Sequence, residues 1–119
     1  MNDYVRVMMH EDLLSVIFDC EADRPLAIGE KINEINEEAY MNGYNWEAFI
    51  DHYLRKHAPD VLVGMSTDPE AGMYAACYDR SAANEARAHK LAEIIRSLIE
   101  NENELYRIIR EEGANIAWD

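Results

Sequence analysis

The sequence predicts an α+β domain in which helices pack on an antiparallel sheet of about four strands. Three observations support this fold class. Apolar side chains occupy every second position in residues 4–10, 14–20 and 72–78, which is the pattern of β-strands. Apolar side chains recur three or four positions apart in residues 28–54 and 91–109, as in helices. The strands and helices come in runs, so the predicted order is β-β-α-α-β-α-α, with an optional last strand.

The two strands at residues 4–10 and 14–20 are predicted to open the domain as a hairpin. The second strand places four apolar side chains on one face, at Leu14, Val16, Phe18 and Cys20. Residues 10–13 between the strands are polar enough for a turn. A polar loop at residues 21–24 follows, and Pro25 suits the first turn of a helix.

Residues 28–54 are predicted to organise the rest of the chain as two helices joined by a sharp corner. One apolar stripe of the first helix contains Ile28, Ile32, Ile35 and Ala39. The pair Asn42-Gly43 is expected to end this helix, because glycine accepts the left-handed conformation that often follows a helix. Asn45 is expected to cap the second helix, with a hydrophobic staple between Tyr44 and Phe49. The second apolar face contains Trp46, Phe49, Ile50, Tyr53 and Leu54.

The remaining elements follow from turn and capping residues. Pro59 is expected to end the second helix after His57. Residues 60–64 favour a helical turn over a short strand, and residues 66–70 a loop. Ser81 can cap a third helix, which residues 101–104 either continue or break, and a further apolar stripe at Leu105, Ile108 and Ile109 leads to Gly113. Ile116 and Trp118 fit a short final strand.

Length and composition limit the broad class of the protein. The 119 residues fit one domain. No apolar run approaches the ~20 residues of a membrane span, and the first residues lack the layout of a signal peptide, so a cytoplasmic location and no membrane partner are expected. Cys20 and Cys77 are expected to be free buried thiols, although neighbouring strands would leave a disulfide open.

Acidic charge is the strongest compositional feature. The net charge is −13, and it is uneven: residues 1–79 hold 16 acidic and 5 basic residues, whereas residues 80–119 hold 8 and 6. Such a surface repels nucleic acid and anionic lipid and attracts basic partners. No basic cluster contains aromatic residues, so nucleic-acid binding is disfavoured. Solubility alone is the other interpretation.

No motif in the chain supports catalysis, a cofactor or a metal site. His52 and His57 are five residues apart, whereas zinc pairs on one helix face are four apart. Ser66 and Ser81 lack the surroundings of an activated nucleophile. The loop with Asp68 and Glu70 lacks the spacing of a calcium-binding loop, and a solvated turn is the better interpretation. We therefore expect no enzyme.

The acidic face of the first predicted helix is a candidate interface. Glu30, Glu34 and Glu37 lie opposite the apolar stripe, beside Glu38. Tyr40, Tyr44 and Trp46 flank these carboxylates, and exposed aromatic residues are typical of interface hot spots. A solvated helix surface is the alternative. Burial of Trp46 would weaken the interface hypothesis.

Three stretches resemble the immunity protein 51 family: IGEKINEINEEAYMNGYNWEAFIDHYL at 28–54, TDPEAGMYAACY at 67–78 and KLAEIIRSLIEN at 90–101. The most specific parts are AYMNGYNWE at 39–47 and DPEAGMY at 68–74. The resemblance covers most of the chain from Ile28 onward. The residues that match distinctive positions of the family are Tyr40, Asn42, Tyr44, Trp46, Glu47, Asp68, Glu70 and Tyr74.

The resemblance implies a protein that binds and neutralises one cognate toxin of a bacterial polymorphic toxin system, without turnover. It supplies no catalytic residues. Acidic charge suits a toxin with a basic substrate cleft, most directly a nuclease. The predicted partner-binding residues are Glu30, Glu34, Glu37, Glu38, Tyr40, Tyr44, Trp46, Glu47, Asp68 and Glu70. A regulatory module that binds a basic partner other than a toxin is the alternative function, and a small carboxylate enzyme is a third. The sequence does not define the oligomeric state.

Overall fold

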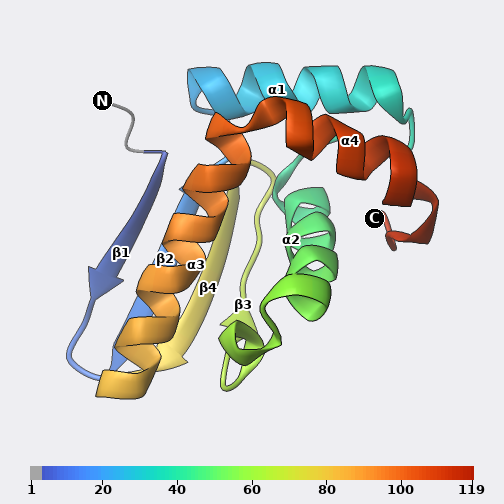
Figure 1. Ribbon diagram of the computed structural model, residues 1–119. Helices are drawn as coiled ribbons and strands as arrows, with labels where there is room; N and C mark the ends of the chain where they lie inside the picture. Colours follow the sequence, from blue (N-terminus) through green and yellow to red (C-terminus); the bar gives the residue numbers. More distant parts are fainter. Residues whose placement is uncertain (1–3) are drawn as a thin grey trace.

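The structure is a computed structural model that describes residues 4–119. Its four strands form one antiparallel sheet in the order β1-β2-β4-β3, with four α-helices packed against it (Figure 1). The strands are β1 (Val5–Met9), β2 (Leu13–Asp19), β3 (Ser66–Thr67) and β4 (Met73–Asp79). The helices are α1 (Asp23–Ile35), α2 (Gly43–His57), α3 (Ala82–Glu100) and α4 (Glu102–Glu112), with 3-10 turns η1 (Pro59–Leu62) and η2 (Gly113–Asn115). The predicted α+β fold class is confirmed.

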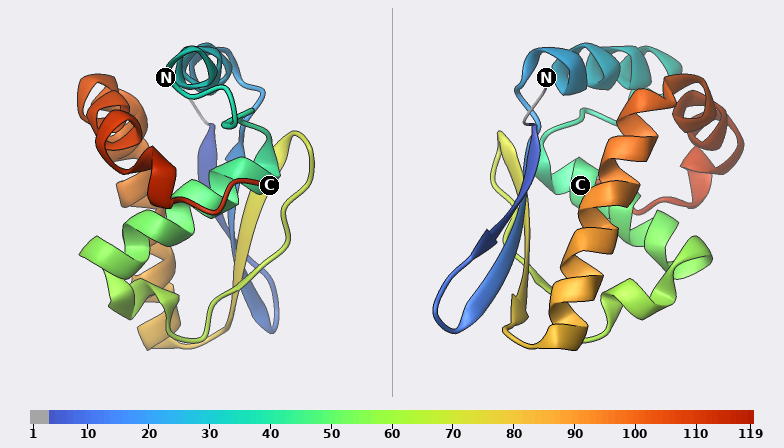
Figure 2. Two further views of the ribbon diagram at one scale, coloured as in Figure 1. Left: turned by 90° about the vertical axis from the view of Figure 1, so that its right-hand side faces the viewer. Right: turned by 60° about the vertical axis from the view of Figure 1, so that its left-hand side comes forward.

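The core lies between one face of the sheet and the helices. β2 is an inner strand, pairing with β1 through Val16 and Val7 and with β4 through Val16 and Ala76. The predicted inner face of β2 is fully buried. The helices lie on a single side of the sheet (Figure 2), so the opposite face keeps half-buried residues such as Ile17 and Cys77.

Helices α1 and α4 run side by side across one end of the sheet, while α3 packs along β1 and β2 (Figure 1). Small buried residues of α3, Ala88 and Ala92, allow its axis to approach the sheet closely. This arrangement leaves the outer side of α1 facing solvent. It also leaves one side of α2 open beside β3 and the C-terminal segment.

Several predicted boundaries are confirmed. The hairpin forms within one residue of its expected limits, and residues 59–62 form the expected helical turn. The Ser81 side chain caps α3 by accepting the Asn84 backbone N–H at 3.1 Å. The run 101–104 breaks the helix, because α3 ends at Glu100 and α4 begins at Glu102.

The predicted corner between the first two helices is wrong in its position. α1 ends at Ile35, and α2 begins at Gly43 with Asn42 as its cap, whose side chain accepts the Asn45 N–H at 3.0 Å. Asparagine side chains explain the early end of α1: Asn36 accepts the Glu38 N–H at 3.0 Å, and Asn33 donates to the Glu37 carbonyl at 3.2 Å. Tyr44 is therefore inside α2, and the predicted staple position before the cap is wrong.

The fourth strand is β3, in the segment predicted as a loop, where Ser66 pairs opposite Cys77. The strand expected at Ile116 and Trp118 is absent from the described chain. The C-terminal segment instead crosses α2 (Figure 2, left), where the Asp119 N–H donates to the Asn45 side-chain oxygen at 2.6 Å. Backbone pairing with a sheet edge is thus replaced by pairing with one asparagine side chain.

Both cysteines are free. Cys77 lies opposite Ser15, whereas Cys20 lies beyond the end of β2, where its N–H donates to the Gly72 carbonyl at 3.0 Å. Neighbouring strands therefore do not bring the two thiols together. Among residues 4–119, no helix combines the length and the apolar character that crossing a membrane requires.

Candidate partner-binding surface and cleft

The four glutamates of the predicted acidic face are all exposed. Glu30 and Glu34 lie on α1 opposite the buried Ile28 and Ile32, while Glu37 and Glu38 follow in the asparagine-stabilised turn. Within the part of the chain that the structure describes, none of the four carboxylates forms an ion pair. Their negative charge is therefore not neutralised by neighbouring side chains.

One exposed tyrosine borders this acidic surface, and a second lies in the first turn of α2 and lines another cleft. Tyr40 is 70% exposed, and its carbonyl accepts the Asn45 side-chain N–H at 2.8 Å. Tyr44, in the first turn of α2, is 41% exposed. Glu30 and Tyr40 line the same hollow, of about 160 Å³, next to Met41. Fixed backbone and exposed rings make this corner suitable for contact with a partner.

Trp46 does not belong to this surface. It is 1% exposed and packs edge-to-face on Phe18, with ring centres 5.0 Å apart, and on Phe49, at 6.2 Å. Burial weakens the interface role predicted for Trp46, because its side chain fills the core between β2 and α2 and is not exposed to a partner. The period of α2 places it with Phe49 and Ile50, which are also buried.

The other three predicted residues lie beside β3. Glu47 of α2 accepts a hydrogen bond from the Thr67 hydroxyl, which ties α2 to β3. Asp68 and Glu70 are exposed, and their backbone N–H groups donate to Ala75 at 2.9 Å and Met73 at 2.8 Å. No single hollow is lined by all ten predicted residues, although Ala71, next to Glu70, lines the same hollow as Glu30 and Tyr40.

A cleft of about 640 Å³ lies between α2, β3 and the C-terminal segment. Its lining combines acidic, basic and aromatic groups, including Tyr44, Glu47, Asp51, Tyr74, Trp118 and Asp119. The Asp119 bond to Asn45 and a 3.0 Å bond from the Trp118 indole N–H to the Gly113 carbonyl fix the C-terminal wall. The same segment and Glu38 border a second hollow, of about 440 Å³.

Tyr74 is the unusual member of this lining. It is 1% exposed, and its hydroxyl has no hydrogen-bond partner among the described residues. Burial raises the pKa of Tyr74, and Tyr78, Glu47 and Asp51 raise it further. The hydroxyl is therefore protonated, and Tyr74 lines the same cleft as Glu47 and Asp51 with the donor and the acceptor of its hydroxyl both unused by the described residues.

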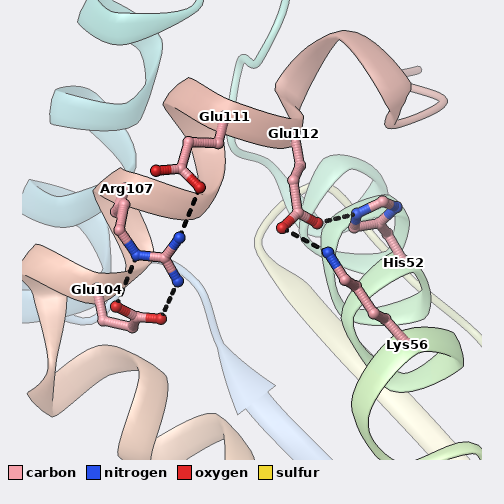
Figure 3. Close-up of polar contacts among 6 residues, drawn as sticks. All are labelled: His52, Lys56, Glu104, Arg107, Glu111 and Glu112. Carbon is pink, nitrogen blue, oxygen red and sulfur yellow. Dashed lines mark hydrogen bonds and ion pairs between the residues drawn. The ribbon is translucent and has the colours of Figure 1, made fainter.

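Two basic side chains that line the cleft, Lys56 and His52, are paired with Glu112. Glu112 of α4 accepts from Lys56 Nζ and pairs with His52 Nε2, each at 2.8 Å (Figure 3). The Lys56 ammonium and the His52 ring lower the pKa of Glu112 to about 2. This cluster joins α2 to α4, and so His52 has a structural partner. Residues 4–119 contain no group of three or more histidine, cysteine or carboxylate side chains arranged to hold a metal ion.

Asp51 and the C-terminal wall are parts of the cleft that local sequence patterns do not reveal. Tyr74 was identified only through the family resemblance. Asp51 belongs to no recognisable sequence motif. The C-terminal wall contains Ile116 and Trp118, whose spacing predicts a strand. Contacts between residues 45 and 119 leave no signal in local periodicity.

Comparison with protein families decides the affiliation. A family model described as Immunity protein 51 matches residues 5–114, which is most of the chain. The chain belongs to the immunity protein 51 family. No curated protein and no solved structure matches it. The immunity protein 51 region contains every strand and α-helix described here, whereas residues 115–119, which form one wall of the cleft, follow it. Membership implies an immunity function, and with it a protein partner.

Proposed function

We propose that this immunity protein binds one cognate bacterial polymorphic toxin in the cytoplasm and neutralises it through its acidic surface. The family match over residues 5–114 is the observation that carries the proposal. Binding alone suffices for such a function, since occluding an active site or holding a toxin inactive involves no chemical step.

The acidic surface supports a basic toxin as the partner. Glu30, Glu34, Glu37 and Glu38 are exposed without ion pairs among the described residues, and the net charge of the chain is −13. A field of one sign accelerates association with a partner of the opposite sign, up to about 10⁸–10⁹ M⁻¹s⁻¹ at low salt. A nuclease, whose substrate cleft must be basic to hold phosphates, has the complementary charge.

The direct test is rescue of growth. A bacterium that expresses the toxin encoded next to this protein should stop growing, and coexpression of the immunity protein should restore growth. A toxin that remains lethal with the immunity protein in excess contradicts the proposal. If a pull-down instead returns a basic protein that is not a toxin, the alternative of a regulatory binding module is supported.

Reversing the charge of the exposed glutamates tests whether they form the toxin-binding surface. Changing Glu34, Glu37 and Glu38 to lysine should slow association with the toxin and flatten its dependence on salt. The matched control changes Glu11, Asp12 and Glu93 to lysine, since these exposed residues lie on the β1–β2 turn and α3 and alter the net charge equally. Equal association rates for both variants would contradict an interface at Glu34, Glu37 and Glu38.

A further inference from the structure

We propose that the cleft beside α2 receives an arginine side chain of the partner, whose guanidinium group hydrogen-bonds to the Tyr74 hydroxyl and the carboxylates of Glu47 and Asp51. The inference deepens the proposed function and rests on it where the arginine belongs to the toxin. It defines a second contact region, separate from the glutamates of α1.

The unpaired hydroxyl of Tyr74 is the first observation. Buried polar side chains in folded proteins are almost always hydrogen-bonded, and each exception calls for an explanation. Tyr78, on the same strand, follows the rule, because its buried hydroxyl donates to the Val61 carbonyl at 2.7 Å. Tyr74 differs because it belongs to the lining of a cleft of about 640 Å³, a size typical of binding sites.

The carboxylates of Glu47 and Asp51 can each accept a further hydrogen bond. Glu47 accepts one hydrogen bond from Thr67. Asp51 pairs through one oxygen with Arg55 at 3.0 Å, and the Arg55 side chain is 74% exposed. An exposed pair of this kind contributes little and is readily exchanged. The other two basic side chains that line the cleft, His52 and Lys56, are held by Glu112.

A guanidinium group matches this set of acceptors better than other groups do. It carries five N–H donors in one plane, so it can serve a hydroxyl oxygen and two carboxylates together. Its flat face stacks on aromatic rings, and Tyr44 and Trp118 line the same cleft. An ammonium group is a compact point charge without this fork, and an anion would be repelled by Glu47, Asp51 and Asp119.

A small probe tests the site without the toxin. N-acetylarginine methylamide is added to the full chain, and the two indole N–H signals are followed by NMR. Trp118 lines the cleft, whereas Trp46 is buried in the core and serves as an internal reference. We expect a saturable shift of the Trp118 signal alone, a weaker response to the lysine analogue, and none to the uncharged citrulline analogue.

Two variants and one control complete the probe experiment. Tyr74→Phe and Asp51→Asn should each weaken binding of the arginine probe about tenfold, the effect of losing a hydrogen bond to a charged group. Tyr74→Phe should fold normally, because the hydroxyl has no partner within the described chain. Asp60→Asn is the control, since Asp60 also forms a single exposed ion pair, with Lys90 at 3.1 Å, but lies outside the cleft.

The kinetics of toxin binding distinguish this inference from the proposed function. Tyr74→Phe and Asp51→Asn should speed dissociation of the toxin complex, whereas reversal of Glu34, Glu37 and Glu38 should slow association. A probe that leaves Trp118 unshifted, or binds Tyr74→Phe as tightly as the unmodified chain, overturns the inference even if the toxin is neutralised. Probe binding together with a toxin that does not associate supports the arginine site and contradicts the proposed function.

Discussion

Gly43 lies so close to Glu70 that a Cβ atom at Gly43 would stand 1.8 Å from the Glu70 carbonyl oxygen. The Met73 carbonyl oxygen would be 2.2 Å from the same atom. The Gly43 N–H also donates to the Ala71 carbonyl at 3.0 Å. The first residue of α2 therefore packs directly on the backbone of the turn before β4. Glycine is required here because there is no space for a side chain, and not because the backbone is left-handed.

Gly43→Ala is expected to destabilise the protein by about 3 kcal/mol, because two backbone carbonyls would have to move to admit one methyl group. Gly29→Ala is the matched control. Its Cβ would lie 3.1 Å from the Met41 Cβ, a tight contact that a shift of a few tenths of an ångström relieves, and alanine gains about 1 kcal/mol of helix propensity inside α1. Urea unfolding measures both changes. Equal midpoints for the two variants would contradict the close approach.

Two tyrosines on β4 give a matched pair for stability. Tyr78→Phe should cost about 1–2 kcal/mol, because it leaves the buried Val61 carbonyl without its donor. Tyr74→Phe removes a hydroxyl that has no partner in the described chain, so the free energy of unfolding should stay the same or rise slightly. Thermal and urea unfolding of both variants check this. A loss for Tyr74→Phe as large as for Tyr78→Phe would show that its hydroxyl is paired in solution.

The elements that the sequence predicted well are those with a strong period. The stripe of α3 and α4 and the inner face of β2 place apolar residues where burial determines the structure. The α1–α2 corner was misplaced because the period continues through Ala39, which is buried although it lies in a turn. The bonds of Asn33, Asn36 and Asn42 override that period, and side-chain capping of this kind fits several positions of an asparagine-rich segment equally well.

The candidate site was predictable only in part. Exposure of Glu30 and Glu34 follows from the helix period of α1, whereas Glu37 and Glu38 are exposed on the turn that follows it. The position of Trp46 could not be decided, since an aromatic residue at the start of a helix suits either a core or an interface. The cleft depends on contacts between α2, β3 and the C-terminal segment, which are distant in sequence. The unpaired Tyr74 hydroxyl becomes visible only when every neighbour of its ring is known.

The two thiols are expected to differ in reactivity. Cys20 is buried, and that burial raises its pKa to about 12, so almost no thiolate forms at neutral pH. Cys77 is partly exposed on the outer face of β4. Iodoacetamide at pH 8 should therefore modify Cys77 first, as measured by peptide mass spectrometry. Both should react equally in urea, and equal rates in the folded protein would contradict the burial of Cys20.

Stability should depend on pH through Glu112, whose carboxylate joins α4 to Lys56 and His52 of α2. The pKa of Glu112 falls from 4.5 to about 2 on folding, because Lys56 first and His52 second hydrogen-bond to the charged form. A lowered pKa stabilises the folded state fully above the unfolded value. This contribution is lost as pH falls from about 4.5 toward 2.

Glu112→Gln should therefore lower the free energy of unfolding at pH 7 by about 1–2 kcal/mol, since the side chain is only 17% exposed. The difference from the unmodified chain should shrink as the pH falls from 4.5 to 3, because Glu112 of the unfolded chain then takes up a proton while the folded chain holds its charge, and it should vanish only near pH 2. Glu111→Gln is the control, because its pair with Arg107 is exposed on both sides and such pairs contribute little to stability (Figure 3). Urea unfolding between pH 3 and pH 7 gives the three curves. A Glu112→Gln difference that stays constant with pH would contradict the lowered pKa.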